Sequence, residues 1–102
     1  MTAHLAVLGN PIAHSRSPEI HSAFAELTGI DLNYEKILVP EGEFESIATN
    51  FMQGGTGLNI TVPYKKTAWR FVDQRSYKVH LAQAVNTISR NASGDLVGDN
   101  TD

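Results

Sequence analysis

Residues 57–65, GLNITVPYK, contain the clearest change from strand to helix in the sequence. Apolar and polar residues alternate as far as Pro63, and this period of two predicts a half-buried β-strand. A short helix is predicted to follow over residues 64–71. Strands that lead directly into helices are typical of α/β domains.

The alternation of strands and helices continues in both directions from this stretch. The predicted order is β-α-β-α-β-α-α-β-β, which favours an α/β domain with a mainly parallel, mixed sheet. Right-handed crossovers would place helices on both faces, as a three-layer α/β/α sandwich. Besides residues 58–62, strands are predicted over residues 4–9, 32–39, 84–90 and 95–97. Besides residues 64–71, helices are predicted from Ser17 to Gly29 and over residues 44–51 and 76–83.

Length and composition bound the class of protein. A chain of 102 residues without repeats or a linker is expected to form one domain, residues 1–102. It has no cysteine, which excludes disulfide scaffolds and thiol nucleophiles. The first residues have no basic segment before their short apolar run, and no apolar stretch approaches the ~18 residues of a membrane span. We therefore expect a cytoplasmic protein.

The charge distribution is uneven. The net charge of −3 argues against a nucleic acid partner. Five of the eight Lys and Arg residues lie between Lys65 and Lys78. This cluster fits either a solvated helix face or a local positive field for a small anion.

Polar side chains gather at predicted carboxyl ends of strands, where ligands bind in such sheets. The first group is GNPIAHSRSP, residues 9–18, in which Ser15 and Ser17 precede a predicted helix. Hydroxyl groups and the free N–H groups of a helix start suit a carboxylate or a polyol. The alternative is that Ser17 is only a helix N-cap and Ser15 a loop residue.

The second group is GLNITVPYK itself. Asn59 and Thr61 are predicted to share one strand face, because side chains alternate, and Lys65 follows the proline turn. Burying such polar groups without partners is costly, so they indicate a ligand. The alternative is a partly exposed strand followed by a surface lysine. On composition alone, Lys66 could equally be the reactive lysine.

The third group combines AVNTI, residues 84–88, with GDNTD, residues 98–102. Asn86 interrupts an apolar strand, which suggests contact with a ligand. Asp102 could form with a lysine the pair that general acid–base chemistry uses, although a terminal residue is often frayed. The histidines lack metal-ligand spacing, so no metal site is expected.

The motifs GNPIAHSRSP, GLNITVPYK, AVNT and GDNTD, in this order and spacing, resemble the N-terminal, substrate-binding domain of shikimate dehydrogenases. The resemblance covers essentially the whole chain. It implies an α/β domain with a six-stranded, mainly parallel sheet. It also implies the NADP-dependent, reversible reduction of 3-dehydroshikimate to shikimate, in the route to chorismate and the aromatic amino acids.

The resemblance assigns roles to the residues of the three groups. Ser15 and Ser17 would hold the shikimate carboxylate, and Lys65, rather than Lys66, would be the general acid–base residue with Asp102 as its partner. The implied substrate-binding residues are Ser15, Ser17, Asn59, Thr61, Lys65, Asn86 and Asp102. Among the departures from the family pattern, Tyr64 stands where its members more often have phenylalanine.

Members of the family continue into a Rossmann domain with a glycine-rich loop, and no G-x-G-x-x-G occurs here. The resemblance therefore implies a fragment that has no cofactor-binding residues and is inactive alone. The alternatives are a quinate/shikimate dehydrogenase, an enzyme acting on an amino-substituted analogue, or a stand-alone shikimate-binding or interaction module. Without a partner domain, apolar surface near the cleft would be exposed and could support self-association.

Overall fold

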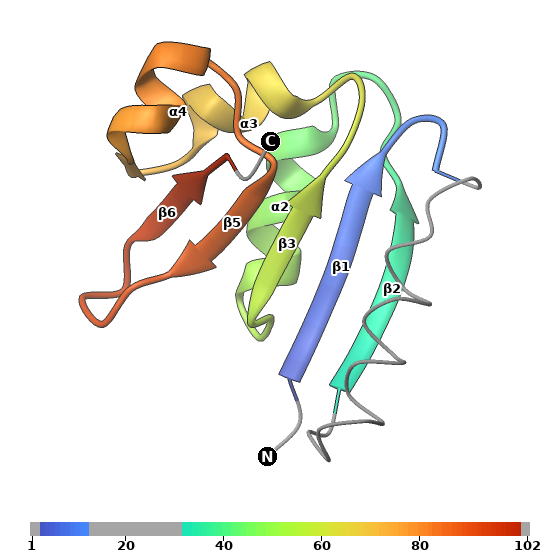
Figure 1. Ribbon diagram of the computed structural model, residues 1–102. Helices are drawn as coiled ribbons and strands as arrows, with labels where there is room; N and C mark the ends of the chain where they lie inside the picture. Colours follow the sequence, from blue (N-terminus) through green and yellow to red (C-terminus); the bar gives the residue numbers. More distant parts are fainter. Residues whose placement is uncertain (1–2, 13–31, 101–102) are drawn as a thin grey trace.

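The computed structural model describes residues 3–12 and 32–100 (Figure 1). Its strands are β1 (Ala3–Gly9), β2 (Leu32–Leu38), β3 (Gly57–Ile60), β4 (Gln74–Arg75), β5 (Thr87–Arg90) and β6 (Leu96–Asp99). Its helices are α2 (Phe44–Met52), α3 (Lys65–Phe71) and α4 (Tyr77–Ala82). The predicted helix from Ser17 to Gly29 lies outside the described residues, so the three-layer arrangement stays a prediction.

The strands form one mixed sheet in the order β2-β1-β3-β5-β6-β4. Strand β1 pairs in parallel with β2 and β3, and β4 pairs in parallel with β6. Strand β5 runs antiparallel to both of its neighbours. The prediction of a mainly parallel, mixed α/β sheet is therefore confirmed. The carboxyl ends of β1, β2, β3 and β6 share one edge of the sheet with the amino end of β5, and we call it the carboxyl edge.

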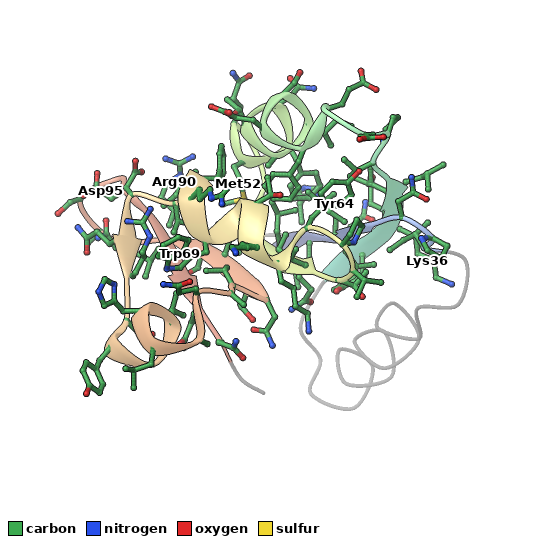
Figure 2. All side chains as sticks on the ribbon, turned by 90° about the horizontal axis from the view of Figure 1, so that it is seen from above. Lys36, Met52, Tyr64, Trp69, Arg90 and Asp95 are labelled. Carbon is green, nitrogen blue, oxygen red and sulfur yellow. The ribbon has the colours of Figure 1, made fainter. Side chains whose placement is uncertain are left out.

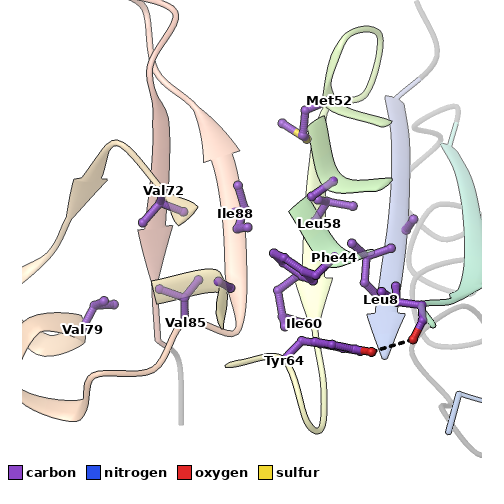
Figure 3. Close-up of a cluster of buried hydrophobic side chains, with 14 residues drawn as sticks. Leu8, Phe44, Met52, Leu58, Ile60, Tyr64, Val72, Val79, Val85 and Ile88 are labelled. Carbon is purple, nitrogen blue, oxygen red and sulfur yellow. Dashed lines mark hydrogen bonds between the residues drawn. The ribbon is translucent and has the colours of Figure 1, made fainter. Parts of the chain in front are cut away.

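The apolar core lies on one face of this sheet, under α2 and α3 (Figure 3). In-register pairing puts Leu8 beside Ile60 and Leu58 beside Ile88 on that face. Helix α2 contributes Phe44, Ala48 and Met52, which recur every four residues and so form one apolar stripe. Burying a large apolar side chain of this kind stabilises the fold by about 1.5–3 kcal/mol.

Tyr64 fixes the start of α3 against the core. Its ring stacks on Phe44 with ring centroids 5.5 Å apart, and Phe71 meets Phe44 edge-on. The Tyr64 Oη donates a hydrogen bond of 2.7 Å to the Val39 carbonyl, just after β2 (dashed in Figure 3). The first turn of α3 is thereby held close to the ends of the central strands.

The boundaries of three strands differ from the predictions. Strand β3 ends at Ile60, because the main chain turns there and Tyr64 N donates to Thr61 O at 3.1 Å. Strand β5 begins only at Thr87, and β6 continues to Asp99. The two-residue strand β4 was not predicted, since exposed Gln74–Arg75 has no apolar pattern and is a strand only through its pairing with β6.

Arg90 ties the β5–β6 hairpin to α2. Its guanidinium donates to the Gly94 carbonyl within the hairpin turn at 2.6 Å and to the Met52 carbonyl at 3.0 Å. Figure 2 shows Arg90 and Met52 side by side, with Asp95 at the turn. Across residues 3–12 and 32–100, no helix combines the length and the hydropathy needed to span a bilayer.

Candidate functional site

The loops at the carboxyl edge are joined by main-chain hydrogen bonds. Thr61 N donates to Leu8 O, and Asn10 N donates to Val62 O, both at 2.9 Å. The segments that follow β1 and β3 therefore continue side by side beyond the sheet. Figure 2 looks down on this edge, with Lys36 of β2 at one side and Arg90 and Asp95 at the other.

Gly9 allows Thr61 to lie against the end of β1. A Cβ atom added at Gly9 would overlap with Thr61 Cγ2 and would lie 3.1 Å from the Val62 carbonyl oxygen. Glycine is thus needed for close approach here, whatever its backbone angles. The half-buried Thr61 follows β3 rather than belonging to it, so the prediction that it lies within the strand is wrong by one residue.

Asn59 lies on the sheet face opposite the core. It pairs with Val7 of β1 and with Thr87 of β5, whereas its neighbours Leu58 and Ile60 point into the core. Asn59 is half-buried, and its Oδ1 accepts a hydrogen bond from Tyr34 Oη of β2. The polar face that the alternation of GLNITVPYK predicted is therefore present at Asn59.

Tyr34 is a site residue that sequence reasoning missed. It lies in the strand predicted over residues 32–39, in which residues 34 and 37 point to opposite faces. Ile37 packs against the core, and Tyr34 reaches Asn59 on the other face. The two residues are three positions apart, and an odd separation along a strand indicates opposite faces. This pattern could have distinguished Tyr34 from the core residue Ile37.

Lys65 and Lys66 differ in exposure. Lys65 is the first residue of α3 and is half-buried, whereas Lys66 is exposed. The Lys65 carbonyl accepts a 2.9 Å hydrogen bond from Val85 N, which ties the start of α3 to the segment before β5. Lys65 therefore lies next to the segment that carries Asn86, and its role stays a prediction.

Asn86 is held from both sides by main-chain hydrogen bonds. Its N–H donates to Asp99 O of β6 at 3.0 Å, and its carbonyl accepts from Ile60 N of β3 at 2.8 Å. The side-chain Oδ1 accepts a 3.0 Å hydrogen bond from Thr87 Oγ1. Asn86 is half-buried and directly precedes β5. Because β5 runs antiparallel to β3, the amino end of β5 lies at the carboxyl edge, and Asn86 lies there with it.

Asp99 supports this arrangement from β6. Its Oδ1 accepts from Ser76 Oγ at 3.0 Å and from Asn100 N at 2.8 Å. Ser76 Oγ also accepts from Val79 N at 3.3 Å and so caps α4. The buried Asn100 donates from Nδ2 to Ala84 O at 3.2 Å, so the end of β6 and the segment before β5 are cross-linked.

The structure brings four of the predicted site residues to one edge: Asn59, Thr61, Lys65 and Asn86. Ser15, Ser17 and Asp102 lie outside the described residues, and their roles stay predictions. Amides, a hydroxyl and an ammonium group suit a small hydroxylated anion. Within the described ranges, no group of three or more His, Asp or Glu side chains could hold a metal ion.

The described residues do not fit a dinucleotide. The glycine-rich residues 54–57, GGTG, lead into strand β3, whereas the dinucleotide fingerprint follows a strand and opens a helix. The described residues therefore contain no dinucleotide fingerprint beside the polar side chains of the carboxyl edge.

Comparison with known proteins identifies the family of the chain. The chain is 52% identical over 103 residues to "Shikimate dehydrogenase (NADP(+))" of Acinetobacter baumannii, covering 100% of this chain but 39% of that protein. A solved shikimate 5-dehydrogenase of Mycobacterium fortuitum superposes with a TM-score of 0.92 at 34% identity, over 99% of this chain and 38% of the other.

A third relative was solved with ligands. It is the shikimate 5-dehydrogenase of Thermus thermophilus, in complex with NADP(H) and shikimate, with a TM-score of 0.87 at 32% identity, over 94% of this chain and 36% of the other. The chain thus spans well under half the length of these relatives. The family described as "Shikimate dehydrogenase substrate binding domain" matches residues 7–88. This match covers most of the sequence, and the chain therefore belongs to the shikimate dehydrogenase substrate-binding domain family.

Proposed function

We propose that residues 1–102 form the substrate-binding domain of an NADP-dependent shikimate dehydrogenase, which reduces 3-dehydroshikimate reversibly to shikimate. Family membership and the names of the relatives support this proposal. The observation that carries it is the gathering of Asn59, Thr61, Lys65 and Asn86 at one edge, on segments joined by main-chain hydrogen bonds.

The chemistry of these side chains suits a ring with hydroxyl groups and one carboxylate. A side-chain amide both donates and accepts hydrogen bonds, so Asn59 and Asn86 can bind hydroxyl groups in either sense. We propose that they and Thr61 bind ring hydroxyls or the carboxylate, and that Ser15 and Ser17 hold the carboxylate. Two hydroxyl donors beside the helix start predicted at Ser17 would favour an anion at that end of the ring.

Lys65 is the proposed general acid–base residue. During reduction the carbonyl carbon of 3-dehydroshikimate gains a hydride, and its oxygen gains a proton. The Lys65 ammonium group would donate that proton, and its amine would take one back in the reverse direction, with Asp102 as its partner. NADP would be bound by the larger part of the protein, for which the described residues provide no site.

Location and partners follow the same proposal. We place the protein in the cytoplasm, with a small-molecule substrate and, given its net charge of −3, no nucleic acid partner. Exposed apolar side chains near the carboxyl edge, Leu38 and Val62, support self-association through that region.

The test replaces each of two adjacent lysines in the protein that unites this chain with its NADP-binding part. Lys65→Ala is expected to lower kcat for shikimate oxidation by about 10²–10⁴-fold, the usual range of acid–base effects. Lys66→Ala is the matched control, because it removes an exposed charge one residue away and should leave kcat within about twofold.

Steady-state rates with shikimate and with quinate complete the experiment. The proposal requires kcat/KM to be higher for shikimate than for quinate. If Lys65→Ala kept most of the turnover, the role of Lys65 would be refuted. If the unaltered protein neither bound nor oxidised shikimate, the proposed function itself would fail.

A further inference from the structure

Asn59 is anchored by a side chain from a strand that is not its neighbour. Tyr34 belongs to β2 and Asn59 to β3, and β1 lies between them. The two residues share a sheet face, because Tyr34 pairs with Leu5 and Asn59 with Val7, which are two residues apart in β1. On that face Tyr34 Oη donates its hydrogen bond to Asn59 Oδ1.

In the structure the Asn59 amide is oriented with its acceptor oxygen towards Tyr34. A side-chain amide has an acceptor oxygen and a donor nitrogen of similar size, and a half-turn exchanges them. With Oδ1 bonded towards β2, Nδ2 points away from β2. Within the described residues Nδ2 has no hydrogen-bond partner. Asn59 is half-buried rather than enclosed.

We propose that Tyr34 is a positioning residue for substrate binding. By holding Oδ1, it presents the N–H groups of Asn59 to the ligand, so that Asn59 acts as a donor to a carboxylate or ring-hydroxyl oxygen. This inference rests on the proposed function of the carboxyl edge. Tyr34 itself acts through Asn59.

The central experiment removes only the hydroxyl group. Tyr34→Phe is expected to raise the Kd and KM for shikimate by about 3–10-fold, the range that one neutral hydrogen bond supplies. Turnover should stay within about twofold, because Lys65 is untouched. Tyr64→Phe is the matched control, because its hydroxyl bonds the Val39 carbonyl on the core face, away from Asn59. It should lower stability and leave KM unchanged.

A double-mutant cycle separates positioning from general structural support. In an Asn59→Ala background, Tyr34→Phe should change KM no further. Asn59→Asp keeps an acceptor for Tyr34 but has no N–H to offer, so it should weaken shikimate binding more than Tyr34→Phe does. In ¹⁵N spectra the side-chain amide signals of Asn59 should shift in Tyr34→Phe and stay in place in Tyr64→Phe.

The outcomes distinguish this inference from the proposed function. An unchanged KM in Tyr34→Phe, or the same KM increase with and without Asn59, would overturn the positioning role while shikimate binding by the unaltered protein stood. A protein that binds no shikimate at all would instead overturn the proposed function.

Discussion

Gly9→Ala tests whether the approach of β1 to Thr61 shapes the carboxyl edge. The new methyl group would overlap with Thr61 Cγ2 and would lie 3.1 Å from Val62 O and 3.4 Å from Ile12 Cδ1. The threonine side chain can rotate away. The Val62 carbonyl cannot move freely, because it accepts the 2.9 Å hydrogen bond from Asn10 N.

These contacts set the expected size of the effect. Overpacking at a well-packed position costs about 1–3 kcal/mol, and a threonine driven off its rotamer contributes about 0.5–1.5 kcal/mol of that. We therefore expect Gly9→Ala to lower the free energy of unfolding by about 1–3 kcal/mol. Because Thr61 Oγ1 moves with the methyl group, the Kd for shikimate should rise by up to about tenfold, which corresponds to about 1.4 kcal/mol.

Urea unfolding and shikimate titration measure the two effects. Gly54→Ala is the control, since a Cβ atom there meets nothing within 4 Å and its stability should change by less than about 0.5 kcal/mol. Thr61→Ser removes the colliding methyl group and keeps the hydroxyl, so it should rescue part of the loss in Gly9→Ala. A Gly9→Ala protein as stable and as tightly binding as Gly54→Ala would refute the reasoning.

Two further predictions concern stability. Ser76→Ala removes both the cap of Val79 N and the hydrogen bond to Asp99, and it should lower the free energy of unfolding by about 1–2 kcal/mol in urea titrations; an unchanged midpoint would show that the cap is dispensable. Leu58→Ala empties a buried site between β1 and β5 and should cost about 2–5 kcal/mol, seen as a lower Tm; a loss below about 1 kcal/mol would mean that the core collapses around it.

Elements with a strong local pattern could be predicted from the sequence. Strand β1 and helix α2 match their predicted ranges to within a residue, because a run of apolar residues or a helical stripe specifies them locally. The same local pattern placed Asn59 on the face opposite the core. Placing Asn59 on that face did not require knowing which strands are neighbours in the sheet.

Features that depend on distant pairing could not be predicted. Strand β4 exists because Gln74 and Arg75 pair with Val97 and Gly98. The late start of β5 at Thr87 has a similar cause, since Val85 N and Asn86 N bond to Lys65 O and Asp99 O before the ladder begins.

The hydrogen bond from Tyr34 to Asn59 also depends on long-range order. It requires β2 and β3 to flank β1, and 24 residues of sequence separate the two side chains along the chain. Local periodicity carries no information about that order. It can, however, tell which residues of β2 point away from Ile37, and Tyr34 is among them.

Strand β3 offers a route to redesigning ligand preference. Leu58 and Ile60 are buried on the core face, while Asn59 points to the other side. Substitutions at Asn59 leave the packed side unaltered, so they can be screened for new hydroxyl patterns with the lost Tyr34 hydrogen bond as their main cost in folding. Insertion or deletion of a single residue would turn the core-facing side chains to the other face and the polar side chains into the core, so it would disrupt both packing and ligand binding. Diversity introduced at this strand should accordingly come from point substitution alone.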